Sequence, residues 1–255
     1  MDLPSIEKLS SKQHLGLANK LVKAKKYKEA VAHLNAVLKT NPNHFKASWI
    51  LYRALDHLDS TDDQRLILEG LYKSHPNDID VLSEICKTYY HQKFLVKALT
   101  LCKKAIQKDS SNPVNHAHLA KSYWDYGKES IALNVIKTAS KRFPKDFSTQ
   151  NIAGQIYLGN KNDKLAMQYF QNAYDIDPKN PSVNIELAKL YAKEKKHKEA
   201  LELLIMSCKT DPYSSRTPLR MATTQLRLSS NYEWAEKYTV ALSACHGKKN
   251  TKKLL

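Results

Sequence analysis

The stretch "YDIDPKNPSVN", residues Tyr174 to Asn184, contains two prolines three residues apart, Pro178 and Pro181. Proline inside a helix removes a backbone hydrogen bond and clashes with the preceding turn. It also moves the residue before it away from helical angles. The stretch therefore predicts that one helix ends here and that another begins.

The first of these prolines recurs at a fixed distance along the 255-residue chain. The positions of Pro42, Pro76, Pro144, Pro178 and Pro212 differ in turn by 34, 68, 34 and 34. The missing position is Ser110, in "KDSSNPVN", which matches "IDPKNPSVN". A fixed period of this length indicates a repeat architecture.

Other residues keep the same period. A mostly small-residue column runs through Ala30, Gln64, Ala98, Ala132, Ala166 and Ala200, and a larger one through Leu21, Leu55, Tyr89, Tyr123, Tyr157 and Tyr191. Within a copy, Ala166, Phe170 and Ala173 recur at helical spacing. The segment "LGNKND" before them is typical of a turn. Each copy therefore predicts a helix, a turn, a second helix and a proline-marked turn.

This pattern resembles the tetratricopeptide repeat (TPR), a helix-turn-helix unit of about 34 residues. The match is nearly complete in the fifth copy, at Gly154, Tyr157, Ala166, Phe170 and Pro178. The resemblance implies an all-α fold, a right-handed α-solenoid of stacked TPR hairpins.

The period also predicts how the chain is divided. We expect an extension or linker over 1–10, six repeats over 11–214, a degenerate seventh repeat or capping hairpin over 215–248, and a basic tail over 249–255. The six repeats are expected at 11–44, 45–78, 79–112, 113–146, 147–180 and 181–214.

Charge and cysteine usage bear on partners and compartment. Lys and Arg number 41 against 25 Asp and Glu, a net charge of +16. Such a field attracts acidic protein segments, nucleic acid or anionic lipid without choosing among them.

The four scattered cysteines predict free thiols that fill the core, with a redox pair as the alternative. Because neither a signal-peptide pattern nor a membrane span is visible, we expect a cytoplasmic protein.

The sequence does not predict catalysis. None of the motifs G-x-S-x-G, G-x-x-x-x-G-K-[ST] and H-E-x-x-H occurs. His116 and His118 lie two residues apart on an expected helix, so they point to different faces. We therefore expect no enzymatic activity, no cofactor and no metal site.

The TPR resemblance implies where a partner would bind. In TPR proteins the concave surface is lined mainly by the first helix of each repeat, and partner peptides commonly lie there. Carried onto this sequence, the peptide-binding face comprises Asn19, Trp49, Arg53, His57, Lys87, Tyr90, His91, Lys121, Trp124, Gln155, Lys189 and Lys193.

Three successive copies place a cation at one position of this face, as Arg53, Lys87 and Lys121. Cations beside aromatic anchors suit an acidic, partly apolar peptide. The competing interpretation is a solvated lysine face. The first hypothesis for function is therefore a non-enzymatic adaptor or scaffold that binds a protein segment.

Three alternatives stay open. The net charge would also suit single-stranded RNA, although the lysines are scattered and no base-reading pair is evident. One protomer could dock in the groove of another and form a homo-oligomer. The array could also be a regulatory module of a larger signalling protein.

Overall fold

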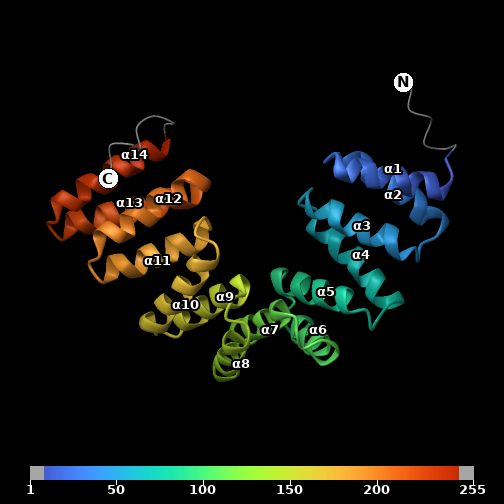
Figure 1. Cartoon of the computed structure of the whole chain (residues 1–255), viewed down its shortest axis with the longest axis horizontal. Coiled ribbons are helices and arrows are strands. Elements are labelled where there is room, and N and C mark those ends of the chain that lie inside the picture. Colours follow the sequence, from blue (N-terminus) through green and yellow to red (C-terminus); the bar gives the residue numbers. More distant parts are fainter. Residues whose placement is uncertain (1–8, 247–255) are drawn as a thin grey trace. The chain divides into compact units, whose positions relative to one another are not determined.

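The computed structural model describes residues 9–246, and every regular element in that range is an α-helix (Figure 1). The all-α expectation is confirmed. The helices are α1 (Ser11–Lys23), α2 (Tyr27–Thr40), α3 (Phe45–Asp56), α4 (Thr61–Ser74), α5 (Ile79–His91), α6 (Leu95–Lys108), α7 (Pro113–Asp125), α8 (Glu129–Arg142), α9 (Phe147–Gly159), α10 (Asp163–Ile176), α11 (Pro181–Lys193), α12 (His197–Thr210), α13 (Pro212–Leu228) and α14 (Tyr232–His246).

Side-chain caps recur with the period of the sequence. The first six odd-numbered helices each follow a residue whose side chain accepts a hydrogen bond from a backbone N–H of the first turn, namely Ser10, His44, Asp78, Asn112, Asp146 and Asn180. Such caps satisfy donors that a helix start leaves unpaired. Pro178 follows the end of α10, and Pro181 is the first residue of α11, where a missing N–H costs nothing. The two prolines therefore act as the sequence predicts.

The turn inside each hairpin also recurs. Its backbone enters the left-handed region at Lys25, Asp59, Lys93, Gly127, Lys161 and Lys195, with φ between 54° and 79°. The next such residue is Ser230, one position later than the period would place it. The turn between α13 and α14 has three residues, as has the turn between α11 and α12, so the extra residue lies before this turn, within Pro212–Leu228.

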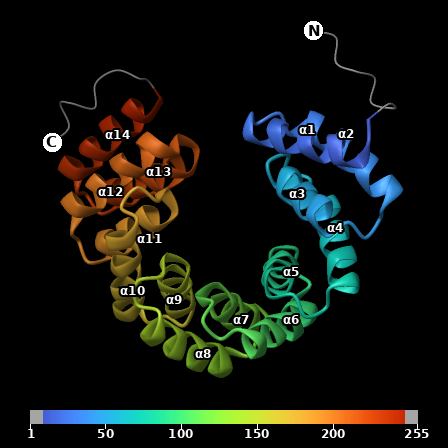
Figure 2. The ribbon, with the colours of Figure 1, turned by 45° about the vertical axis from the view of Figure 1, so that its right-hand side comes forward.

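The chain forms two compact units, 1–127 and 128–255, and each is described by itself. In the first unit α1–α2, α3–α4 and α5–α6 are hairpins stacked in order, and α7 packs on α5 and α6 (Figure 2). In the second unit α8 packs on α9, and the hairpins α9–α10, α11–α12 and α13–α14 follow. Both units are thus stacks of helical hairpins.

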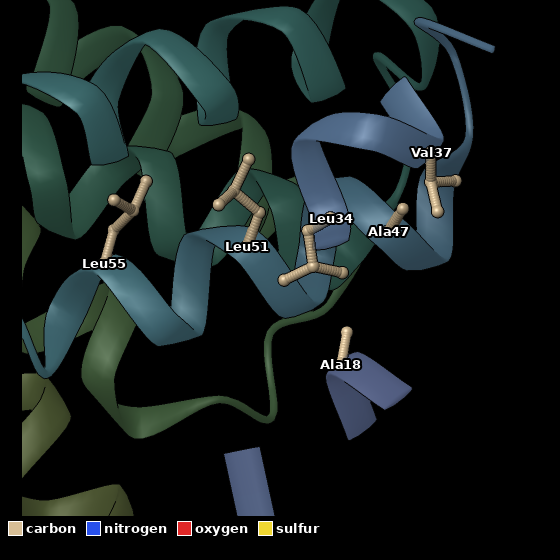
Figure 3. Packing of buried hydrophobic residues seen from close by; sticks show 6 residues of the cluster. All are labelled: Ala18, Leu34, Val37, Ala47, Leu51 and Leu55. Atoms are coloured by element: carbon tan, nitrogen blue, oxygen red, sulfur yellow. The ribbon is translucent and has the colours of Figure 1, made fainter. Parts of the chain in front are cut away.

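The core consists of the repeated columns. Ala18 of α1, Leu34 and Val37 of α2, and Ala47, Leu51 and Leu55 of α3 form one buried cluster that joins the first two hairpins (Figure 3). The five alanines of the small-residue column are all fully buried. Gln64 occupies the one place in this column that is not alanine. Its amide donates a hydrogen bond to the Asp56 carboxylate at 2.9 Å, so the polar group is satisfied.

The expectation of free thiols is wrong. Cys86 of α5 is bonded to Cys102 of α6, and Cys208 of α12 to Cys245 of α14, with Cα atoms 5.1 and 5.8 Å apart. The physical reason is the register of the hairpin. Cys86 and Cys102 occupy the positions that Gly154 and Phe170 occupy two repeats later, where Phe170 lies against the α-carbon of Gly154.

Candidate functional site

The candidate site in the first unit is the face built by α3, α5 and α7, which we call the α3–α5–α7 face. Tyr52 of α3 donates its hydroxyl to the Glu84 carboxylate of α5 at 2.5 Å. Lys87, one turn further along α5, donates to the same oxygen at 3.1 Å. The first bond connects α3 to α5, and the second, within α5, fixes the direction of Lys87.

A second set of contacts connects α5 to α7. The His118 ring of α7 lies 5.3 Å from the Tyr90 ring and 5.5 Å from the His91 ring, measured between centroids. Asp125 at the end of α7 accepts hydrogen bonds from Lys121 at 2.7 Å and from Lys93 at 3.1 Å. The face is therefore a continuous set of aromatic rings and ion pairs across three helices.

Burial shifts the titration of several of these groups. Burial, with a contribution from Asp125, raises the pKa of Tyr90 to about 12. Burial also lowers the pKa of His118 to about 4, and the nearby His91 and Lys87 act in the same direction. The pKa of Asp125 is lowered: burial opposes the shift, but the hydrogen bonds from Lys121 and Lys93 outweigh it. At neutral pH the face thus has a neutral His118 and a charged Asp125.

The three predicted cations are not equivalent. Lys87 is paired with Glu84 and Lys121 with Asp125. Arg53 is exposed and forms no ion pair with any residue in 9–246. Arg53 is therefore the cation of the row whose charge is not already compensated within the fold.

The two tryptophans of the predicted peptide-binding face are partly covered by their neighbours. Trp49 and Trp124 are both half-buried. The Trp49 ring packs between Phe45, 6.0 Å away, and Tyr52, 5.7 Å away. Each tryptophan presents part of a rigid apolar surface to solvent, which suits an anchor for a partner side chain.

Two predicted residues make local contacts at the edge of this unit. The Asn19 amide donates to the Leu15 carbonyl of its own helix at 2.8 Å. His57 stacks on the Tyr27 ring at 4.2 Å, at the end of α3. Neither is connected by a described contact to the rings and ion pairs of the α3–α5–α7 face.

The three predicted residues of the second unit lie on α9 and α11. Gln155 donates to Asn151 at 3.4 Å, Lys189 is paired with Glu186 at 2.7 Å, and Lys193 is paired with Asp163. No described contact links Gln155 to either lysine. Gln155 is thus separate from the two lysines, which lie one turn apart on α11 and line the same cavity.

Sequence reasoning missed Tyr52, Glu84, His118 and Asp125. A signal existed for Asp125, because it lies four residues after Lys121, the spacing at which a carboxylate and an amine meet on one helix face. Tyr52 and Glu84 lie on helices of different repeats, so their pairing follows only from the stacking of adjacent repeats.

Within residues 9–246 no group of three or more His, Cys, Asp or Glu side chains is arranged to hold a metal ion. Among the described helices none is both long and apolar enough to cross a membrane.

Comparison with known proteins gives the same architecture. Models of the tetratricopeptide repeat match residues 15–79, 118–181 and 158–216. The search of curated proteins found no match.

Solved structures give matches at low sequence identity. A thermophilic TPR protein of Thermus thermophilus is 18% identical, with 72% of this chain and 100% of that chain covered and a TM-score of 0.56. Pseudomonas aeruginosa PilF is 18% identical, with 78% and 90% covered and a TM-score of 0.62. Human IFIT1, solved as a dimer with PPP-AAAA, is 17% identical, with 93% and 58% covered and a TM-score of 0.62.

At these identities the structural likeness concerns the fold alone. The repeat models are more specific, because they recognise the residues of the repeat itself and together match more than half of the sequence. The chain belongs to the tetratricopeptide repeat family.

Proposed function

We propose that this TPR scaffold is a non-enzymatic adaptor that binds an acidic, partly apolar protein segment on the α3–α5–α7 face. The observation that carries the proposal is the combination on three stacked helices of an uncompensated Arg53, the paired Lys87 and Lys121, and the half-buried Trp49 and Trp124. Aromatic anchors and arginine are the residue types that dominate protein interfaces.

The internal ion pairs support exchange with a ligand. Lys87 and Glu84 are both partly exposed, and ion pairs of this kind contribute at most about 1 kcal/mol. A ligand carboxylate can therefore replace Glu84 as the partner of Lys87 at little cost. Lys121 and Asp125 are each only 17% exposed, so that pair is held more firmly and orients the edge of the face.

Arg53 supplies the strongest contact available to a carboxylate. Its guanidinium can donate two parallel hydrogen bonds to one carboxyl group, whereas a lysine acts as a point charge. We assign the first carboxylate of the partner to Arg53, and an adjacent apolar side chain to the Trp49 ring one turn earlier on α3.

The test is a binding titration with a fluorescein-labelled peptide of alternating Glu and Leu, and with its Gln counterpart. Arg53→Glu should weaken binding of the acidic peptide at least about tenfold, because it replaces an attraction by a repulsion. The double variant Lys87→Glu/Lys121→Glu should weaken binding of this peptide further. Retained helicity by circular dichroism would establish that both variants fold.

Overall charge requires its own control, since any acidic peptide is attracted to a protein of charge +16. Lys137→Glu/Lys141→Glu reverses two exposed lysines of α8 and gives the same net charge as the double variant. The affinity of this control variant for the acidic peptide should be within about twofold of wild type at about 0.15 M salt, where distant surface charges are largely screened. Equal loss in both double variants would remove the claim for this face.

RNA and a second copy of the chain are the competing partners. Titration with an oligonucleotide at two salt concentrations separates specific RNA binding from binding through charge alone, because the latter weakens steeply as salt rises. Micromolar affinity for RNA that survives at physiological salt would favour RNA, and light scattering would reveal a homo-oligomer.

The division into repeats is part of the same proposal. We propose that the helix pairs from α1–α2 to α11–α12 are six repeats and that α13–α14 is the capping hairpin. Residues 1–8 of the expected extension, residues 247–248 of the expected capping hairpin and the whole expected tail, 249–255, lie outside the described residues. A role as a regulatory module of a larger signalling protein stays an alternative.

The disulfides bear on the compartment. Disulfide bonds persist in oxidising compartments and are rare in the cytosol. Cys86–Cys102 and Cys208–Cys245 therefore support an oxidising compartment, in place of the cytoplasm that we expected because neither a signal-peptide pattern nor a membrane span is visible. Alkylation of acid-quenched cells followed by mass measurement tests this, and four labelled cysteines would favour the cytoplasm.

A further inference from the structure

The second unit contains a cavity of about 720 Å³ between α11, α12, α13 and α14. Its apolar lining includes Ala188, Ala192, Leu204, Pro218, Ala222 and Leu226. Four of these are alanine or proline, which leaves the floor smooth. The volume falls in the range of about 300–1,000 Å³ that small-molecule sites occupy.

The cavity has an origin in the repeat. Ala192 belongs to a column with the period of the repeat, in which the three preceding copies carry Tyr90, Trp124 and Leu158. A large side chain therefore stands at this position in each of those copies, whereas here a methyl group leaves the space open. The first two copies carry Val22 and Asp56 at this position, and among the first six copies alanine occurs only at Ala192.

Charge at the cavity has one sign. Lys189, Lys193 and Lys195 line it, and none of the described lining residues is acidic. Lys189 is paired with Glu186 and Lys193 with Asp163. Lys195 forms no ion pair with any described residue, so it is the cation available to an anionic ligand.

The hydrogen-bonding groups of the lining favour an alkyl chain over an extended peptide. The Ser229 hydroxyl donates to the Leu226 carbonyl at 3.1 Å, and the Tyr238 hydroxyl donates to the His197 carbonyl at 3.2 Å. These two donors are therefore already used, and the buried Nδ1 of His197 is a single polar atom of the lining with no hydrogen-bond partner among the described residues. A peptide brings a backbone donor and acceptor with each residue, and burying them unpaired is costly. An alkyl chain has no such groups.

We propose that this cavity binds a medium-chain acyl carboxylate, with its alkyl chain on the alanine-rich floor and its carboxylate at Lys195. The site lies in the second unit and does not use the α3–α5–α7 face. Its failure and the failure of the proposed adaptor function are therefore distinguishable.

Calorimetric titration of the full chain with hexanoate, octanoate and decanoate tests the proposal. Affinity should rise about fourfold for each methylene that enters the cavity. Nonyltrimethylammonium, with the same nine-carbon alkyl chain and the opposite charge, should bind at least about tenfold more weakly than decanoate. Equal affinity for decanoate and nonyltrimethylammonium would overturn the assignment of the charge.

Two variants localise the site. Ala192→Leu restores the residue of the preceding copy and fills part of the cavity, so it should weaken decanoate binding at least about tenfold. Lys195→Glu should weaken decanoate binding about tenfold. Lys198 is an exposed residue of α12 outside the lining, so Lys198→Glu makes the same charge change and should leave decanoate affinity within about twofold of wild type. Ala222→Leu provides a second filling variant if Ala192→Leu does not fold. Unchanged decanoate affinity in the filling variants would overturn the proposal.

Discussion

Replacement of Gly154 by alanine tests the packing of the hairpins. Gly154 is buried in α9 against Phe170 of α10, which is fully buried itself. A Cβ added at Gly154 would lie 2.6, 2.7 and 2.8 Å from the Cδ1, Cε1 and Cγ atoms of the Phe170 ring. Ordinary carbon–carbon contacts are about 3.5–4.0 Å, so the ring or a helix must move by roughly 1 Å.

Two effects of opposite sign decide the outcome. Alanine is favoured over glycine inside a helix by about 1 kcal/mol. Overpacking a filled core costs about 1–3 kcal/mol. The contact includes Cγ, the ring atom nearest the backbone, so the ring cannot swing away. We expect the packing cost to win and the free energy of unfolding to fall by up to about 2 kcal/mol.

Urea denaturation followed by circular dichroism measures this change. Gly16→Ala and Gly70→Ala are matched controls, because a Cβ at either helical position meets nothing within 4 Å. The free energy of unfolding of both control variants should rise by up to about 1 kcal/mol. Phe170→Leu should partly rescue Gly154→Ala, as expected for two residues in contact. If Gly154→Ala stabilises the protein as much as Gly16→Ala does, the packing account is refuted.

The remaining predictions concern stability and pH. The pKa of His118 lies at about 4, below its ordinary 6.5, so the unfolded state binds more protons between these values and stability falls as pH drops through this window. The loss should be about 2 kcal/mol at pH 5 relative to pH 7, and His118→Asn should remove most of it in denaturation curves. Ala166→Leu should lose about 1–3 kcal/mol by overpacking a fully buried column, and an unchanged melting curve would count against the column. Reduction with dithiothreitol should lower the free energy of unfolding, by about 3 kcal/mol for the Cys86–Cys102 loop of 16 residues, as measured with and without reductant. Lys161→Gly should raise the melting temperature, because Lys161 has a φ of 58°, a conformation that costs side chains roughly 1–2 kcal/mol.

The fold could be predicted from the sequence because one period governs several independent features. Prolines, buried alanines, caps and left-handed turn residues all recur with that same period. The Cys86–Cys102 bond was also within reach, since the repeat places these two positions face to face in a hairpin. We expected core filler, with a redox pair as the alternative, whereas the facing positions favour a bonded pair.

The site was less predictable, because its pairs join neighbouring repeats. The row of Lys87 and Lys121 follows from the period, but Glu84 and Asp125 compensate both charges. Their geometry depends on how deeply α3, α5 and α7 pack against one another. The burial of the Trp49 and Trp124 side chains depends on the same packing, so the sequence pattern alone does not give it.

The central claim is that the α3–α5–α7 face accepts an acidic segment through Arg53 beside Trp49. The most direct measurement is a nuclear magnetic resonance titration with the Glu–Leu peptide that follows the Arg53 Nε–H and Trp49 indole N–H signals. We predict that both signals shift together and saturate at one peptide concentration, while lysine signals of α8 stay in place. Shifts spread evenly over all surface cations, or an unmoved Arg53 signal at saturation, would contradict the account.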